Sequence, residues 1–136
     1  MELQINCDGG ARGNPGPAAI GIAIRKKDGM VLYEYKEAIG EATNNVAEYT
    51  AACKSLEFAR GYEPDSVLIE MDSQLVVKQI NGEYNVKAPH LQDLNNRVAE
   101  LTKGLDVEFT YVPRNTRRQK AADALVNEAL DAQSAR

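Results

Sequence analysis

The sequence contains few of the residues that carry redox, disulfide or transition-metal chemistry. Among 136 residues there are two cysteines, one histidine and no tryptophan. Cys7 falls in a strand-like run and Cys53 in a helix-like run, and neither belongs to a Cys-x-x-Cys pair or a Cys/His cluster. This pattern excludes a disulfide-rich secreted scaffold and a cysteine-based metal site. Reduced thiols are typical of a cytoplasmic protein, which is the location we expect.

Long apolar runs are also missing. No stretch approaches the roughly 20 apolar residues of a membrane-spanning helix. The N-terminal residues lack the basic and apolar regions of a signal peptide. We therefore expect no association with a membrane. The length, together with an apolar fraction of 43%, fits one globular domain over residues 1–136, and we take a monomer as the default state.

Positive charge is scarce. The chain has 16 basic and 20 acidic residues, a net charge of −4 and an isoelectric point near 5.1. Proteins that coat nucleic-acid phosphates without specificity are usually basic, so this composition argues against such a protein. A nucleic-acid ligand would require a small local site, where divalent cations offset the repulsion between acidic protein and phosphate.

The apolar periodicity predicts strands in the first third of the chain and mainly helices afterwards. A Gly/Pro-rich loop is expected at 9–18 and a polar, basic loop at 113–119. The expected strands are 3–8, 20–24, 30–38, 67–71 and 107–111, and the expected helices are 44–61, 73–80, 89–103 and 120–132.

This order of elements predicts an α/β fold with a mixed sheet. The first three strands follow one another directly, as in hairpins, and the last two are each reached through helices. Right-handed crossovers would place strands 67–71 and 107–111 parallel to the first strand. Ligand chemistry on such sheets gathers where the carboxyl ends of parallel strands meet.

Acidic residues follow that edge of the predicted sheet. Asp8 ends the first strand and Asp72 ends the fourth in the same way, so parallel neighbouring strands would place their carboxylates side by side. Glu48 lies one turn into the first helix. Asp123 lies one turn into the last helix, among alanines that allow a helix to approach a sheet closely.

Converging carboxylates favour a bound cation, because they otherwise repel one another and take up protons. Oxygen ligands without a Cys or His cluster point to Mg²⁺ or Mn²⁺. Two such ions can clamp the attacking and leaving oxygens of a phosphoryl displacement. Each acid also has a purely structural interpretation: Asp72 suits a helix cap and Asp8 suits a turn. Spacing alone leaves both interpretations open.

Four motifs, in order, resemble those of the type 1 ribonuclease H family. They are DGGARGNPGP at 8–17, TNNVAE at 43–48, DSQ at 72–74 and ADALVNEA at 122–129, and together they cover nearly the whole chain. The resemblance implies a ribonuclease-H-like mixed five-stranded sheet of order 3-2-1-4-5, flanked by helices. It also implies endonucleolytic cleavage of the RNA strand of RNA/DNA hybrids, leaving 5′-phosphate and 3′-hydroxyl ends.

The resemblance assigns roles to individual residues. It gives the binding of two Mg²⁺ ions, with Mn²⁺ as an alternative, and catalysis to Asp8, Glu48, Asp72 and Asp123. It gives contacts with the hybrid to Gly9, Asn14, Thr43, Asn44, Asn45 and Gln74. Neutral amides suit this task because they bond 2′-hydroxyls and base edges in a wide minor groove. Asn44 and Asn45 also suit helix capping, and the glycines also suit turns.

The chain departs from the family pattern in two places. The loop before the last helix has no histidine and resembles the branch with a Val-Pro-Arg loop, so Arg114, with Arg118 second, is the candidate for that position. An arginine stays charged, so its role there would be electrostatic; the other interpretation is a solvated basic loop. Residues 82–88 replace the basic helix and loop of many members, and we expect weaker hybrid binding as a result.

Two other interpretations share the fold. One is a non-catalytic module that binds RNA/DNA hybrids, against which the intact set of four acids argues. The other is an integrase-like or Holliday-junction enzyme, against which the TNN and DSQ motifs argue. Double-stranded RNA is a further candidate substrate that the sequence leaves open.

Overall fold

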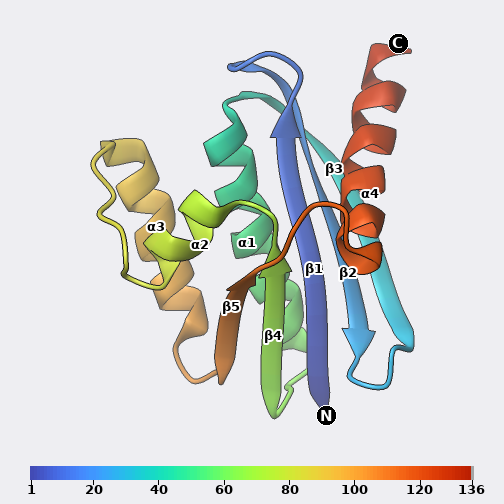
Figure 1. The fold of residues 1–136 in the computed structure, drawn as a ribbon, viewed down its shortest axis with the longest axis vertical. Coiled ribbons are helices and arrows are strands. Elements are labelled where there is room, and N and C mark those ends of the chain that lie inside the picture. The colour runs from blue at the N-terminus through green and yellow to red at the C-terminus, as the bar shows by residue number, and fades with distance from the viewer. Residues whose placement is uncertain (136) are drawn as a thin grey trace.

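The computed structural model describes residues 1–135 and shows a mixed five-stranded sheet flanked by helices (Figure 1). The strand order is β3-β2-β1-β4-β5, which confirms the predicted α/β fold and the order 3-2-1-4-5. The elements are β1 (Glu2–Ala11), β2 (Gly16–Lys26), β3 (Val31–Ala42), α1 (Asn44–Gly61), β4 (Ser66–Met71), α2 (Gln74–Ile80), α3 (Pro89–Thr102), β5 (Val107–Tyr111) and α4 (Arg117–Ser134).

The pairing of β1 sets the direction of the sheet. β1 runs antiparallel to β2, with Ile5 opposite Ile24, and parallel to β4, with Ile5 beside Ile69. β5 continues the sheet in parallel beyond β4. The parallel arrangement predicted from the crossovers is therefore confirmed, and the carboxyl ends of β1 and β4 point to the same edge.

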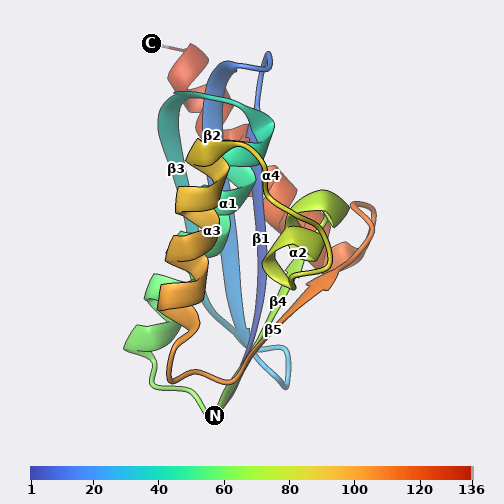
Figure 2. The same cartoon turned by 90° about the vertical axis from the view of Figure 1, so that its left-hand side faces the viewer.

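Helices cover the two faces unequally (Figures 1 and 2). On one face, the apolar side chains of β1 and β2 pack against α1, and α3 packs beside α1; Ile5, Ile22 and Tyr49 are fully buried there. On the other face, α4 crosses β1, β2 and β3, with Val126 and Leu130 buried. Within residues 1–135, no helix combines the length and apolarity needed to cross a membrane.

The first three strands are longer than predicted, since β2 spans Gly16–Lys26 instead of 20–24 and β3 ends at Ala42 instead of residue 38. The reason is clearest for β1. Asp8 does not end it, because Gly9 and Gly10 continue the ladder opposite Ile20 and Ala19 as far as Ala11. The predicted glycine-rich loop at 9–18 is thereby reduced to residues 12–15. Cross-strand pairing with β2 extends the strand through glycines that local propensity assigns to a turn.

The last helix also begins earlier than predicted. α4 starts at Arg117 instead of residue 120, so residues 117–119 belong to the helix and not to the basic loop. Gln119 explains the error, because its polar side chain is fully buried and conceals the apolar periodicity. Its amide donates to the carbonyl of Cys7 at 2.9 Å and accepts from Asn6 at 3.0 Å. Asp123 consequently lies in the second turn of the helix.

Candidate active site

Three of the four predicted acids converge at the carboxyl edge of the sheet. Asp8 of β1, Glu48 of α1 and Asp72, directly after β4, each place a carboxylate oxygen within 4.8 Å of the others. Asp8 and Glu48 are buried, and the side chain of Asp72 is 3% exposed. Asp123 lines the same cavity of about 380 Å³ from α4 but stands outside the tight group. The structure thus brings all four to one cavity.

Two close backbone contacts bring these elements together. A Cβ atom on Gly9 would lie 2.2 Å from the carbonyl oxygen of Ala47, so α1 can rest on β1 only because residue 9 is glycine. A Cβ atom on Gly21 would lie 2.4 Å from the carbonyl oxygen of Ala122, which fixes α4 against β2. The first contact places Glu48 beside Asp8, and the second places Asp123 at the cavity.

The electrostatics of the site favour a cation. Burial, followed by the charge of Asp72, raises the pKa of Asp8 to about 8. Burial, followed by the charge of Asp8, raises the pKa of Glu48 well above its usual value. The Oε2 atom of Glu48 is buried and has no hydrogen-bond partner among residues 1–135. These oxygen donors suit a hard divalent cation, which would satisfy the orphaned oxygen and offset the repulsion.

The two candidate arginines have different surroundings. Arg114 lines the acidic cavity, and its Nε donates to Oδ2 of Asp72 at 3.3 Å. The charge of Asp72 raises the pKa of Arg114, whose side chain is 78% exposed and therefore free to reorient. Arg118 instead donates to the side-chain amide oxygen of Gln4 and lines another cavity. Of the two arginines, Arg114 therefore lies at the acidic cavity and Arg118 lies elsewhere.

The predicted hybrid-contacting residues include a connected polar set at the start of α1. The Oγ1 of Thr43 caps the helix by accepting from the N–H of Val46 at 3.2 Å. The side-chain oxygen of Asn14 accepts from the N–H of Asn44 at 3.0 Å, and Asn44 accepts from the N–H of Ala11 at 2.9 Å. These contacts give Thr43, Asn14 and Asn44 structural roles in holding the edge of the cavity.

The remaining predicted contact residues lie around the same cavity. Gly9 and Asn45 line it together with Asn44. Gln74 opens α2 with an exposed side chain, immediately after Ser73, which caps that helix through the N–H of Val76. The structure gives no further side-chain bond to Asn45 or Gln74 within residues 1–135.

Sequence reasoning missed residues that support the acids. Asn127 donates to Oδ2 of Asp123 at 3.4 Å, and the spacing of four residues in a helix is a signal that could have suggested this pair. Gln119 and Asn6 join α4 to β1 beside Asp8, as the hydrogen bonds above show. No sequence signal marks Gln119, because a buried glutamine in a helix resembles an exposed one.

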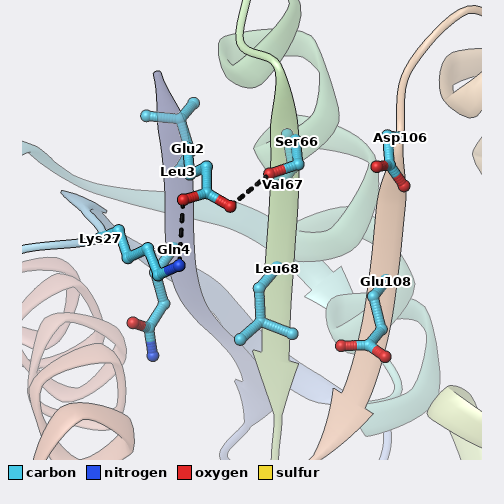
Figure 3. A pocket seen from close by; sticks show the side chains of 9 residues that line it. All are labelled: Glu2, Leu3, Gln4, Lys27, Ser66, Val67, Leu68, Asp106 and Glu108. Carbon is cyan, nitrogen blue, oxygen red and sulfur yellow. Dashed lines mark hydrogen bonds and ion pairs between the residues drawn. The ribbon is translucent and has the colours of Figure 1, made fainter.

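A second hollow lies at the opposite edge of the sheet (Figure 3). Side chains of β1, β4 and β5 line this volume of about 430 Å³ near the amino-terminal ends of the strands. The carboxylate of Glu2 is paired there with Lys27 at 3.1 Å and accepts from Ser66 at 3.4 Å. Its acids do not form a tight group like that of Asp8, Glu48 and Asp72, so we assign it no catalytic role.

The fold and the acidic cavity together define a ribonuclease-H-like α/β protein, and comparisons with known proteins place the chain more narrowly. Residues 6–129 match the family model described as "Reverse transcriptase-like". The ribonuclease H of Hydrogenovibrio crunogenus is 32% identical over 144 residues, which cover 96% of this chain and 97% of that protein. The chain belongs to the ribonuclease H family.

A further relative and a solved structure match the chain over different shares of their own lengths. The ribonuclease HI of Halobacterium salinarum is 46% identical over 125 residues, which cover 91% of this chain but 62% of the relative. Among solved structures, the RNase H1 named LC11, in complex with an RNA/DNA hybrid, is 40% identical with a TM-score of 0.90 and coverage of 97% of this chain and 99% of that one. The chain thus spans less than two thirds of the halobacterial protein.

Proposed function

We propose that this chain hydrolyses the RNA strand of RNA/DNA hybrids with two Mg²⁺ ions, leaving 5′-phosphate and 3′-hydroxyl ends. The observation that carries the proposal is the convergence of Asp8, Glu48 and Asp72 in a cavity that Asp123 completes. Membership of the ribonuclease H family and the likeness to a hybrid-bound RNase H1 support the choice of substrate.

Asp8, Glu48, Asp72 and Asp123 would hold the cations, and Mn²⁺ is the alternative ion. When bound, these ions would supply Lewis-acid polarisation of the scissile phosphate and a water of lowered pKa. The carboxylates themselves orient the site: Asp8 and Glu48 come from a strand and a helix locked together at Gly9, so their oxygens are held at fixed positions. A rigid arrangement of this kind lowers the cost of assembling the reactants.

We further propose that Arg114 acts electrostatically. This role fits the resemblance of its loop to the family branch in which Val-Pro-Arg replaces a histidine. Its guanidinium lies beside Asp72 at the rim of the cavity and stays protonated at neutral pH. It can therefore balance negative charge on a phosphate or on the departing product. It cannot serve as a proton acceptor, which separates its role from that of a loop histidine.

Recognition of the hybrid falls to the amides around the acids in this proposal. Asn45 and Gln74 are the candidates for direct contact, because the structure gives their side chains no other hydrogen bond within residues 1–135. Asn14, Thr43 and Asn44 would shape the start of α1 and contact the RNA/DNA hybrid at the same time. Gly9 would bring its backbone close to the hybrid. Double-stranded RNA offers the same 2′-hydroxyls, so it is the second substrate to test.

The experiment is cleavage of an end-labelled RNA/DNA hybrid beside double-stranded RNA, duplex DNA and single-stranded RNA. Wild type, Asp72→Asn and Asp93→Asn are compared, because Asp93 is an exposed acid on α3 outside the site. We expect wild type and D93N to cut the hybrid alone, with ends that phosphatase treatment identifies as 5′-phosphates. We expect D72N to be at least about 100-fold slower.

Wild type that binds the hybrid but does not cut it in Mg²⁺ or Mn²⁺ would contradict the proposed hydrolysis. The non-catalytic binding module would then be the leading function. Cutting of duplex DNA would instead favour the integrase-like alternative. A monomeric state and a cytoplasmic location remain predictions, which sedimentation and cell fractionation test.

A further inference from the structure

A separate cavity with strongly positive walls lies between the first turn of α4 and the hairpin of β2 and β3. Its volume is about 420 Å³. It is lined by Arg25, Gly29, Val31, Arg117, Arg118 and Ala121. The acidic cavity takes other residues of α4, beginning at Asp123, so the two sites use different parts of the helix.

Across the described residues, no acidic side chain forms an ion pair with the three arginines of this cavity. Arg118 donates to Gln4, which is a neutral amide. The Nη1 atom of Arg25 is buried and finds no hydrogen-bond partner in the described part of the chain. A buried, unsatisfied guanidinium donor is costly, and an anion at this place would satisfy it.

Neighbouring charges reinforce the positive character of the cavity. The negative charge of Glu34 on β3 favours the protonated form of Arg25 and by itself would raise its pKa. Burial and the guanidinium of Arg118, followed by Arg117, nevertheless lower the pKa of Arg25 overall. Repulsion from Arg118 and Arg117 therefore outweighs the attraction of Glu34 at Arg25, although the whole chain carries −4. Such a concentration of unpaired cations is itself destabilising unless an anion occupies it.

Two backbone features lie beside the cavity. Gly29 has a φ of +98° in the hairpin turn, and a Cβ atom there would lie in ordinary contact with Nη2 of Arg118 at 3.5 Å, so the turn lies directly beside that guanidinium. Thr116 precedes α4 without making a side-chain capping bond. The open N–H groups of the first turn add positive potential at the same end of the helix.

We propose that this cavity binds a phosphate-bearing anion, with Arg25, Arg117 and Arg118 as its ligands. Arginine is the residue suited to this task, because its planar guanidinium donates paired hydrogen bonds to phosphate oxygens. The volume is in the range of small-molecule sites, which fits a free phosphorylated compound better than a bare ion. The proposal goes beyond nuclease activity and does not rest on it, since binding is measured without cleavage.

The test is calorimetric titration with pyrophosphate in EDTA, at constant ionic strength. The variants are Arg25→Gln, Arg117→Gln and Lys120→Gln. Arg117 is exposed, so its replacement does not threaten folding, and Lys120 is a matched cation on α4 that does not line the cavity. We expect saturable binding to wild type and K120Q, and at least about tenfold weaker binding to R25Q and R117Q.

Labelled-amide NMR in the same titration locates the site. Shifts concentrated at residues 25–31 and 117–121 would support the proposal. It would be overturned by no binding at millimolar pyrophosphate, by equal losses in K120Q and R117Q, or by shifts confined to the acidic cavity.

A final arm separates the two sources of phosphate. A short RNA/DNA hybrid is added to the pyrophosphate complex in EDTA, where cleavage cannot occur. If the hybrid displaces pyrophosphate from wild type, and this displacement is absent in R117Q, the site is assigned to backbone phosphates of the nucleic acid. Simultaneous binding would assign it to a free phosphorylated compound, which is the result we expect because the cavity is separate from the acids. Either result supports the phosphate site.

Discussion

Asp8 is held in an environment that opposes its ionisation. It is 4% exposed, and burial and the charge of Asp72 raise its pKa from 3.8 to about 8, while Glu48 beside it is shifted in the same direction. A residue in this position lowers the stability of the metal-free protein at neutral pH. A buried Asp8 is explained by a function that requires its negative charge, and cation binding at the proposed site is such a function.

Replacement of Asp8 by Asn therefore stabilises the metal-free protein. The folded state of wild type binds protons more tightly than the unfolded state, so its free energy of unfolding falls as pH rises from about 4 to about 8. D8N lacks this loss. Its free energy of unfolding should therefore exceed that of wild type by an amount that grows over this pH range to on the order of 2–4 kcal/mol. Urea unfolding in EDTA at several pH values measures it. A constant difference across the range would contradict the prediction.

Gln119 shows a residue whose importance only the structure reveals. Its side chain is fully buried and connects α4 to Asn6 and the carbonyl of Cys7. Gln119→Ala should cost about 2–4 kcal/mol, because it leaves a cavity and unsatisfied polar groups. Lys120→Ala, on an exposed neighbour, should stay within about 0.5 kcal/mol of wild type. Chemical denaturation of both variants decides, and equal effects would show that the buried bonds contribute little.

Motifs pointed to four acids that the structure places around one cavity, but they did not point to the residues that support them. Asp8 and Asp72 stand out because each follows an alternating or apolar run in the sequence, and the resemblance adds Glu48 and Asp123. Gln119, Arg25 and Arg117 carry no such mark in the sequence, since their surroundings depend on contacts between segments far apart in the chain. The roles of all these residues remain proposals until tested.

At the scale of elements, glycine sets how closely helices approach the sheet. Gly9 meets α1 and Gly21 meets α4 at distances that exclude any side chain. A close approach is what allows short acidic side chains from a strand and a helix to reach one another. The geometry of the acidic site is therefore determined by backbone contacts as well as by the acids themselves.

Gly9→Ala should accordingly displace α1 and damage the site. We expect a loss of about 1–3 kcal/mol in unfolding free energy, together with weaker Mg²⁺ binding as Glu48 moves away from Asp8. Gly61→Ala at the end of α1 is the control, because nothing lies within 4 Å of its added Cβ and its φ is not positive. Calorimetry with Mg²⁺ and thermal unfolding provide the readouts. A G9A protein that binds Mg²⁺ like wild type would refute the argument.

Every predicted element appears in the structure, and the errors lie at element ends. β1 extends beyond Asp8 and α4 begins before residue 120. In both places a tertiary contact outweighs local preference: cross-strand pairing recruits glycines into β1, and burial of Gln119 begins α4 early. Local sequence patterns contain neither contact, so they could not place these boundaries.

For the whole molecule, we expect the acidic balance and the short segment 82–88 to limit attraction to nucleic acid. The net charge is −4, and residues 82–88 contain one lysine against one glutamate. Phosphate contacts provide much of the affinity of nucleic-acid-binding proteins. We therefore expect hybrid binding to depend on a few local contacts and to be improved by added positive charge in the segment 82–88.

Glu83→Lys tests that expectation. Glu83 is exposed in this segment, and the variant should bind an RNA/DNA hybrid in EDTA a few-fold more tightly, with the gain disappearing at high salt. Asp106→Lys, at the opposite edge of the sheet shown in Figure 3, makes the same charge change and should have a smaller effect. Fluorescence anisotropy over a salt series compares them. Equal gains would indicate that only net charge matters.

The most direct test of the central claim is the rate of hybrid cleavage as Mg²⁺ is titrated into metal-free wild type and Asp8→Asn. The claim is that the carboxylates gathered around Asp8 act through a divalent cation. It predicts no cleavage by wild type in EDTA, a rate that rises and saturates with Mg²⁺, and a D8N protein that stays folded but near background. Cleavage in EDTA, or a D8N rate equal to that of wild type, would contradict it.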